Sequence, residues 1–133
     1  MSAARLRFRV HDERLAIARL AREAPLPEWA RGGFVTISRT ADELSVVCPE
    51  RHVPAGVQQE RERVALGIEG VIPMTTVGLL ARLCAALAER GVPVFVISTY
   101  DTDWILVHAG KFAEARAALE ALGHEVRGEL PAG

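Results

Sequence analysis

The sequence is poor in the residues that form disulfides and metal sites. Its two cysteines, Cys48 and Cys84, lie far apart and in no CxxC pattern, which predicts free thiols rather than a disulfide or a zinc site. The four histidines, at positions 11, 52, 108 and 124, are equally scattered. No two of them have the i, i+4 spacing that places two imidazoles on one metal ion. We therefore expect no metal and no cofactor.

Aromatic residues and an excess of either charge are also missing. Only 5% of the residues are aromatic, and 16 Lys and Arg balance 17 Asp and Glu. Sheets that bind RNA use exposed aromatic side chains, and polyanions attract basic proteins, so we expect no nucleic acid partner. No apolar run approaches the roughly 18 residues of a membrane span, and Arg5, Arg7 and Arg9 interrupt the place of a signal-peptide core. We expect a cytoplasmic protein without a membrane partner.

Enzyme signatures are absent as well. The sequence has no GxSxG, HExxH or GxxxxGK[ST] motif and no cysteine with a histidine at a familiar spacing. Asp101 and Asp103 form a carboxylate pair, but side chains two residues apart in a turn diverge, so turn and cap roles are favoured. We predict a non-enzyme, and a small hydrolase or isomerase that uses both aspartates is a minor alternative.

The C-terminal half has the clearest secondary-structure pattern. The spacing of apolar residues and the positions of glycine predict strands at 63–71, 92–97, 104–108 and 124–127. The strand at 92–97 is apolar on both faces, so we expect it to be covered on both. Two helices are predicted, one capped by Thr75 or Thr76 and ended by Gly91, and one at 111–122. In the first helix Val77, Leu80, Leu83, Cys84 and Leu87 form the apolar stripe, and in the second Phe112, Ala115, Leu119 and Leu122 point inward. This β-α-β-β-α-β order is the ferredoxin-like arrangement.

The N-terminal half is mostly strands. RLRFRV at 5–10 alternates arginine with apolar residues, RLAIARL follows, and 34–39 and 44–48 predict a hairpin. Pro25 and Pro27 limit any helix nearby to about one turn. Shifting the sequence by 60 positions places ISRTADELSVV over ISTYDTDWILV without a gap, which indicates an internal repeat. We predict an α+β fold of two ferredoxin-like modules in tandem, 1–60 with eroded helices and 61–133 complete.

Gly78 falls in the first turn of a predicted helix, where glycine costs about 1 kcal/mol relative to alanine. Two explanations are open. Either the helix backbone packs closely on the sheet, or a small anion such as an amino-acid carboxylate binds to the free N–H groups of the helix start.

Two segments resemble a known family. VIPMTTVGLLARLCAALAERGVPVFVISTYDTDWILV is similar to the ACT domain, a small βαββαβ amino-acid-sensing module. GFVTISRTADELSVVCPE together with ISTYDTDWILV resembles the bacterial tandem-ACT proteins related to the eukaryotic cytosolic arginine sensors. The resemblance covers about residues 15–126, and STYDTD is among its most specific parts.

The resemblance implies a non-catalytic regulatory protein, a homodimer or an internal pair of modules that binds an amino acid where two sheets meet and acts on an unknown partner protein. It implies that a carboxylate meets the N–H groups of 76–78 and that an amine meets Asp101, Asp103 or nearby carbonyls. The residues so implied are Ile72, Thr75, Thr76, Val77, Gly78, Ser98, Thr99, Tyr100, Asp101 and Asp103. Many ACT domains have an acid where this chain has Thr75. A ligand-free dimerisation or protein-interaction module is therefore the alternative.

Overall fold

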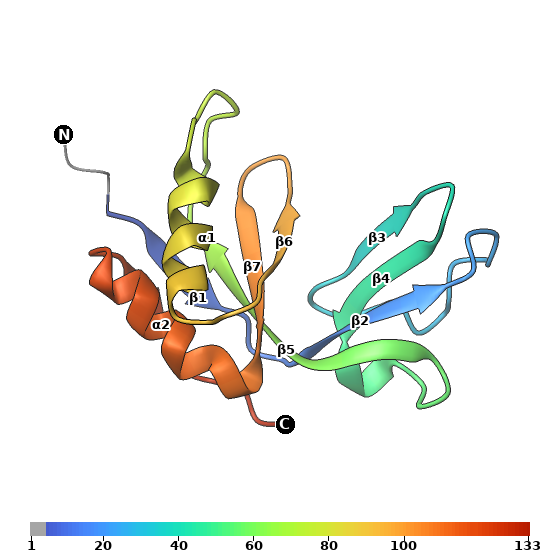
Figure 1. Ribbon diagram of the computed structural model, residues 1–133. Coiled ribbons are helices and arrows are strands. Elements are labelled where there is room, and N and C mark those ends of the chain that lie inside the picture. The colour runs from blue at the N-terminus through green and yellow to red at the C-terminus, as the bar shows by residue number, and fades with distance from the viewer. Residues whose placement is uncertain (1–4) are drawn as a thin grey trace. The chain divides into compact units, whose positions relative to one another are not determined.

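The computed structural model describes residues 5–133, which form two compact units (Figure 1). Unit 1 contains residues 5–12 and Val64–Pro131, and unit 2 contains Glu13–Arg63 and Ala132–Gly133. The secondary structure is a mixture of helices and strands, which confirms the predicted α+β class. Among the described residues, no helix is both long enough and apolar enough to cross a lipid bilayer.

Unit 1 has the predicted β-α-β-β-α-β order. Its elements are the second part of β5 (Gln58–Ile68), α1 (Leu79–Glu89), β6 (Phe95–Ser98), β7 (Asp103–His108), the 3-10 turn η2 (Ala109–Lys111), α2 (Phe112–Ala121) and β8 (Glu125–Arg127). A fifth strand, β1 (Arg7–Val10), lies between β5 and β8, antiparallel to β5 and parallel to β8. Residues 5–12 therefore group with the C-terminal half, which differs from the predicted division after residue 60.

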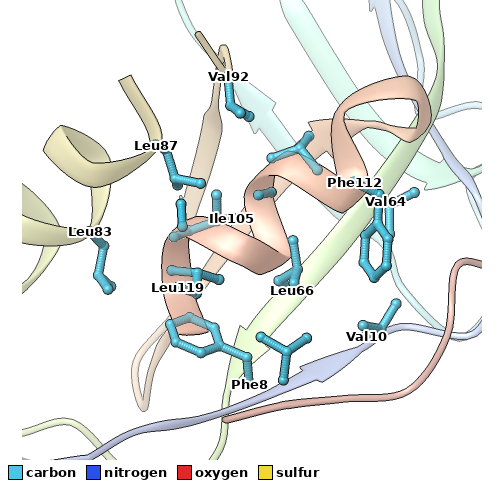
Figure 2. Close-up of a cluster of buried hydrophobic side chains, with 14 of the residues drawn as sticks. Phe8, Val10, Val64, Leu66, Leu83, Leu87, Val92, Ile105, Phe112 and Leu119 are labelled. Carbon is cyan, nitrogen blue, oxygen red and sulfur yellow. The ribbon is translucent and has the colours of Figure 1, made fainter. Parts of the chain in front are cut away.

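The core of unit 1 lies between the sheet and its two helices (Figure 2). The strands contribute every second residue, as Phe8 and Val10 show on β1, where Arg7 and Arg9 are exposed. The helices contribute residues three or four apart, which form one apolar stripe per helix. The largest fully buried side chains of this core are Phe8, Leu66, Leu83, Leu87, Ile105 and Leu119.

The start of α1 differs from the prediction. The N-cap is Gly78, in the left-handed region at φ 82°, and no side chain caps the helix. Capping by Thr75 or Thr76 was therefore wrong, because a turn in which the Thr76 N–H donates to the Pro73 carbonyl comes first. Val77 is 87% exposed and does not belong to the apolar stripe.

Two further expectations for unit 1 were wrong. The strand at 92–97 was expected to be covered on both faces, but Val94 and Phe95 are each 37% exposed. An apolar run gives no information about whether a second layer exists to cover it. Leu122 is 47% exposed, because α2 ends at Ala121.

Unit 2 is an antiparallel sheet in the order β3–β4–β2–β5, formed by β2 (Leu15–Leu20), β3 (Thr36–Arg39), β4 (Leu44–Pro49) and the first part of β5. A 3-10 turn, η1 (Glu50–His52), follows β4, and residues 13–63 contain no α-helix. Its core consists of Ala16, Ala18, Leu44, Val46, Cys48 and Val53.

The two hairpins have the same four-residue turn but a different offset from the one predicted. Arg39 pairs with Leu44 in unit 2, and Ser98 pairs with Asp103 in unit 1. From 39 to 98 and from 44 to 103 the offset is 59 residues, one fewer than the 60 read from the sequence. The predicted alignment was therefore one residue out of register, which places every side chain on the opposite face.

Candidate functional site

A pocket of about 300 Å³ lies at one end of unit 1, where the segment between β5 and α1 meets the β6–β7 turn. Figure 1 shows both segments at the same end of the unit. Its lining comes from Ile72, Pro73, Met74, Thr76, Gly78, Leu79, Leu80, Ala81, Ser98, Thr99, Tyr100, Thr102 and Asp103.

Hydrogen bonds fasten the β6–β7 turn to the strand end beside it. The Ile72 N–H donates to the Asp101 carbonyl at 2.7 Å, and the Thr102 hydroxyl donates to the Ile68 carbonyl at 2.7 Å. The turn is itself closed by the Thr99 N–H, which donates to the Thr102 carbonyl at 2.8 Å. Both walls of the pocket are therefore held in place without a ligand.

The start of α1 gives the pocket a positive end. The N–H groups of Leu79, Leu80 and Ala81 precede the first helical bond, which runs from the Arg82 N–H to the Gly78 carbonyl at 3.1 Å. No acidic residue lies in the first turn, so the helix dipole is not neutralised by the chain itself. A side chain at Gly78 would need the unfavourable left-handed backbone, and its Cβ would lie 3.2 Å from a guanidinium nitrogen of Arg82.

The opposite wall gives the pocket a negative group. The Ser98 hydroxyl donates to Oδ1 of Asp103 at 2.6 Å, and Asp103 is half-buried. This bond uses one carboxylate oxygen and leaves acceptor capacity for a cation. At the corresponding register unit 2 has Arg39 and Leu44, so this polar pair is specific to unit 1.

The rim of the pocket carries exposed apolar side chains. Met74 and Tyr100 line the opening and are 74% and 85% exposed, and Val71 and Val77, in the same segment as Met74, are 72% and 87% exposed. A group of large apolar side chains in water is unusual for a surface with no partner. These four residues, Val71, Met74, Val77 and Tyr100, are called the rim.

Seven of the ten predicted site residues line the pocket, namely Ile72, Thr76, Gly78, Ser98, Thr99, Tyr100 and Asp103. Thr75, Val77 and Asp101 are exposed and do not line it. The Thr76 N–H is already donated to the Pro73 carbonyl and is not available for the anion contact expected at 76–78, whereas the N–H groups of 79–81 have no intrahelical acceptor. Sequence reasoning missed Leu79, Leu80 and Ala81, because it placed the helix start too early.

The pocket is not suited to metal binding or to acid–base catalysis with paired carboxylates. Asp103 is the single carboxylate of its lining, and the lining contains no histidine or cysteine. A protein metal site generally needs several such ligands. The pair Asp101 and Asp103 does not converge on the pocket, because only Asp103 faces it.

Comparison with known proteins agrees with this architecture. Residues 60–121 match the family model of the ACT domain, and residues 13–56 match a model described as an N-terminal domain. A crystal structure of a protein from Agrobacterium tumefaciens is similar with a TM-score of 0.89 at 29% identity, covering 98% of this chain and 99% of that one. No protein among those with curated descriptions matches the chain.

More distant structures share the fold alone. A Vibrio cholerae protein of unknown function, described as a possible transport protein, has a TM-score of 0.69 at 21% identity and covers 88% of this chain and 89% of its own. The regulatory subunit of aspartate kinase from Thermus flavus has a TM-score of 0.64 at 11% identity and covers 87% of this chain and 96% of its own.

Proposed function

We propose that the chain is a non-catalytic regulatory protein that binds an amino acid in the pocket of unit 1, since residues 60–121 match the family model of the ACT domain. The proposal rests on one observation: a single small pocket has the N–H donors of a helix start at one end and the carboxylate of Asp103 at the other. A volume of about 300 Å³ is at the lower end of the range for ligand pockets, which suits a small metabolite rather than a nucleotide.

The α-carboxylate would bind at the start of α1. The N–H groups of Leu79, Leu80 and Ala81 have no intrahelical acceptor, and the helix dipole favours a negative charge there. Gly78 keeps this approach open, because it carries no side chain in front of these donors. The backbone supplies the contact, so the carboxylate is recognised in any amino acid.

The ammonium would bind at Asp103. Its carboxylate is oriented by the Ser98 hydroxyl at 2.6 Å and faces the same pocket as the helix start. A hydrogen bond between two charged groups in a half-buried site is about twice as strong as a neutral one. This contact would supply the amine partner that many ACT domains have at the position of Thr75.

The side chain of the ligand is expected to be neutral. Asp103 is the one carboxylate of the lining, and the ammonium occupies it, so a guanidinium or a second ammonium has no carboxylate partner. The remaining lining is largely apolar, with Ile72, Met74, Leu79 and Leu80 among its members. We therefore expect a neutral amino acid, and arginine is disfavoured despite the resemblance to arginine sensors.

Isothermal titration of the full chain with each of the twenty amino acids tests the proposal. At least one neutral amino acid should bind with a dissociation constant below 1 mM, roughly the weak end of specific binding. If none does, the pocket is not an amino-acid site.

A matched pair of variants assigns the contact. Asp103→Asn preserves the shape and an acceptor for Ser98 but removes the charge, and should weaken binding roughly 10- to 100-fold, as the loss of a hydrogen bond to a charged group does. Asp101→Asn removes the same charge two residues away, outside the lining, and should leave the affinity unchanged. Equal effects of the two substitutions would contradict direct contact with Asp103.

The exposed rim favours a second copy of the chain as the cover of the pocket. Met74, Val77 and Tyr100 are 74 to 87% exposed, and association would remove this apolar surface from water. Sedimentation velocity should show a dimer that the bound amino acid strengthens. A dimer of equal stability with and without every amino acid would instead support the ligand-free dimerisation module.

A further inference from the structure

A charged surface separate from the pocket lies on the face of the unit 1 sheet opposite the helices. The alternation of β1 and β8 sends Phe8, Val10 and Val126 into the core, so Arg7, Arg9 and Arg127 point to the other face. Arg5 precedes β1 and lies two residues before Arg7, so the alternation assigns it to the same face. We call this surface the arginine face: Arg5, Arg7, Arg9 and Arg127, with Glu69 and Glu125 between them.

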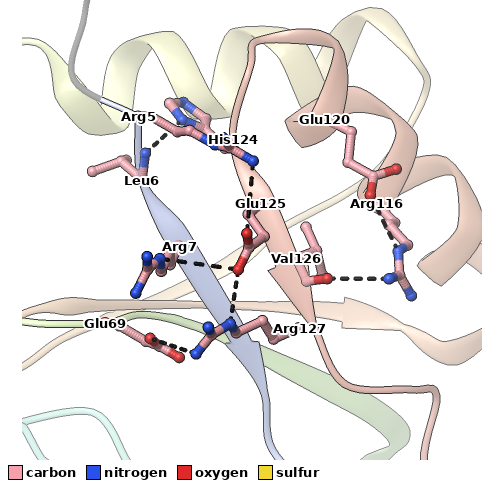
Figure 3. A network of polar contacts seen from close by, with 10 residues as sticks. All are labelled: Arg5, Leu6, Arg7, Glu69, Arg116, Glu120, His124, Glu125, Val126 and Arg127. Carbon is pink, nitrogen blue, oxygen red and sulfur yellow. Dashed lines mark hydrogen bonds and ion pairs between the residues drawn. The ribbon is translucent and has the colours of Figure 1, made fainter.

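The two glutamates are ion-paired with the four arginines, and Figure 3 shows both glutamates with Arg5, Arg7 and Arg127. Glu125 lies 3.6 Å from Arg5, 4.0 Å from Arg7 and 2.7 Å from Arg127. Glu69 lies 3.8 Å from Arg127 and 4.0 Å from Arg9. Arg127 therefore joins the two groups into one network, in which each carboxylate is shared by at least two guanidinium groups.

The network has more positive than negative charge, and the positive groups are the accessible ones. Four guanidinium groups face two carboxylates, which leaves an excess of two positive charges. The arginine side chains are 54 to 72% exposed, and Glu69 and Glu125 are only 25% and 34% exposed. The field at this face is therefore positive although the whole chain has a net charge of −1.

The register adds an unfavourable contact that an anion would relieve. Arg9 lies directly opposite Arg127 on the neighbouring strand, and like charges in that position repel each other. Glu69 is the carboxylate that both arginines contact, at 3.8 Å from Arg127 and 4.0 Å from Arg9. Each of these two guanidinium groups keeps donors for a further acceptor, because a guanidinium has five N–H donors.

We propose that the arginine face is a docking surface for an extended acidic segment of a partner protein, with carboxylates at alternate residues. Arg5, Arg7 and Arg9 follow one another at every second position, so their Cα atoms are roughly 6.5 to 7 Å apart. Carboxylates on one side of an extended peptide have the same spacing. Guanidinium groups bind carboxylates through two parallel hydrogen bonds.

A protein segment fits this face better than single-stranded nucleic acid does. The outward residues of β1 and β8 are Arg7, Arg9, Glu125 and Arg127, and none of them is aromatic. The ring of Trp104 lies on the same face over Gly67, the partner of Arg9 on β5, but a single ring packed down on a glycine is not a series of stacking platforms. Proteins that bind single strands combine basic grooves with aromatic side chains on which bases stack. The two glutamates would also repel a continuous row of phosphates, whereas side-chain carboxylates at chosen positions can avoid them.

Fluorescence anisotropy of the full chain with a dye-labelled peptide (Ser-Glu)6 at low salt tests this proposal. Two further probes are a peptide of the same composition with all serines before all glutamates, and a uridine dodecanucleotide. The alternating peptide should bind most tightly, and its affinity should fall with added salt because the contacts are exposed. The double variant Arg7→Gln/Arg9→Gln should bind about tenfold more weakly, which is two surface ion pairs of ordinary strength.

Two control variants separate this surface from other arginines and from the pocket. Arg90→Gln removes an exposed arginine at the end of α1 and should bind the alternating peptide like the wild type, as should Asp103→Asn. No binding of the alternating peptide, equal affinity for the two peptides, or equal affinity of the double variant and the wild type would each overturn the proposal. Tighter binding of the oligonucleotide would assign the face to nucleic acid instead.

Discussion

Gly67→Ala is the substitution with the most direct consequence for the architecture of unit 1. Gly67 lies on β5, and the ring of Trp104 on β7 covers it, so that an added Cβ would lie 2.5 to 2.7 Å from three ring carbons. Real Cβ atoms do not approach a ring so closely, and an indole fixed on a strand cannot move away as the end of a long side chain can. The ring must therefore shift as a whole.

The expected cost follows from overpacking. Inserting one methyl group into a filled contact destabilises a protein by about 1 to 3 kcal/mol. Alanine recovers about 0.5 to 1 kcal/mol relative to glycine in a strand interior, because the unfolded chain loses less entropy. We expect a net loss of about 0.5 to 2 kcal/mol in the free energy of unfolding.

The two tryptophans provide the assay, since Trp104 belongs to unit 1 and Trp29 to unit 2. In a Trp29→Phe background, urea unfolding followed by fluorescence reports on unit 1 alone. The midpoint should fall and the native emission of Trp104 should shift, because its ring leaves Gly67. Trp104 follows Asp103 and pairs with Ile97, so affinity for the amino acid should weaken as well, if the pocket binds one.

Two further variants decide the cause. In Gly56→Ala the added Cβ has no neighbour within 4 Å, so its effect should be within about 0.5 kcal/mol of zero. The double variant Gly67→Ala/Trp104→Ala, followed by circular dichroism, should show a favourable coupling of about 1 kcal/mol relative to the sum of the single changes. Full stability of Gly67→Ala, or the absence of coupling, would refute the steric argument.

Two other predictions concern buried titratable groups. Burial, and then the nearby Arg82, lower the pKa of His124 below its usual 6.5, and its Nδ1 accepts the Leu6 N–H at 3.0 Å. The unfolded chain therefore binds the proton more tightly, so the free energy of unfolding should fall as pH decreases below about 6.5. His124→Asn, which offers an oxygen at the place of Nδ1, should flatten this dependence in urea titrations at pH 5 and 7, and an unchanged slope would contradict the assignment. Burial raises the pKa of the Cys48 thiol, which makes this thiol unreactive in the folded chain. A disulfide reagent at pH 8 should therefore modify one thiol per folded chain, that of Cys84, and both thiols in urea. Rapid modification of Cys48 in the folded chain would be evidence against its burial.

Much of the fold could be predicted from local periodicity. The alternation of Arg7, Phe8, Arg9 and Val10 gives β1 and both of its faces, and the spacing of buried residues gives α1 and α2. Periodicity does not report which strands pair, so the insertion of β1 between β5 and β8 could not be foreseen. That pairing depends on contacts more than 50 residues apart along the chain.

The site was predicted in outline but shifted along the chain. The sequence pointed to Gly78 and to the turn after Ser98, which the structure brings together around one pocket. It could not locate the helix start, because Thr75 and Thr76 are good capping residues on propensity alone and the left-handed backbone of Gly78 is a property of the folded chain. The donors at 79–81 were therefore overlooked.

The corrected register separates the structural part of the STYDTD segment from its candidate functional part. At the offset of 59, Thr99 corresponds to Thr40, and both hydroxyl groups accept N–H groups of their own turns. A feature that both hairpins share is explained by turn formation and needs no ligand. Ser98 and Asp103 have no such counterpart, and they alone join a half-buried carboxylate to the pocket. The turn residues therefore form the scaffold, and the pair that flanks the turn is where ligand recognition is expected.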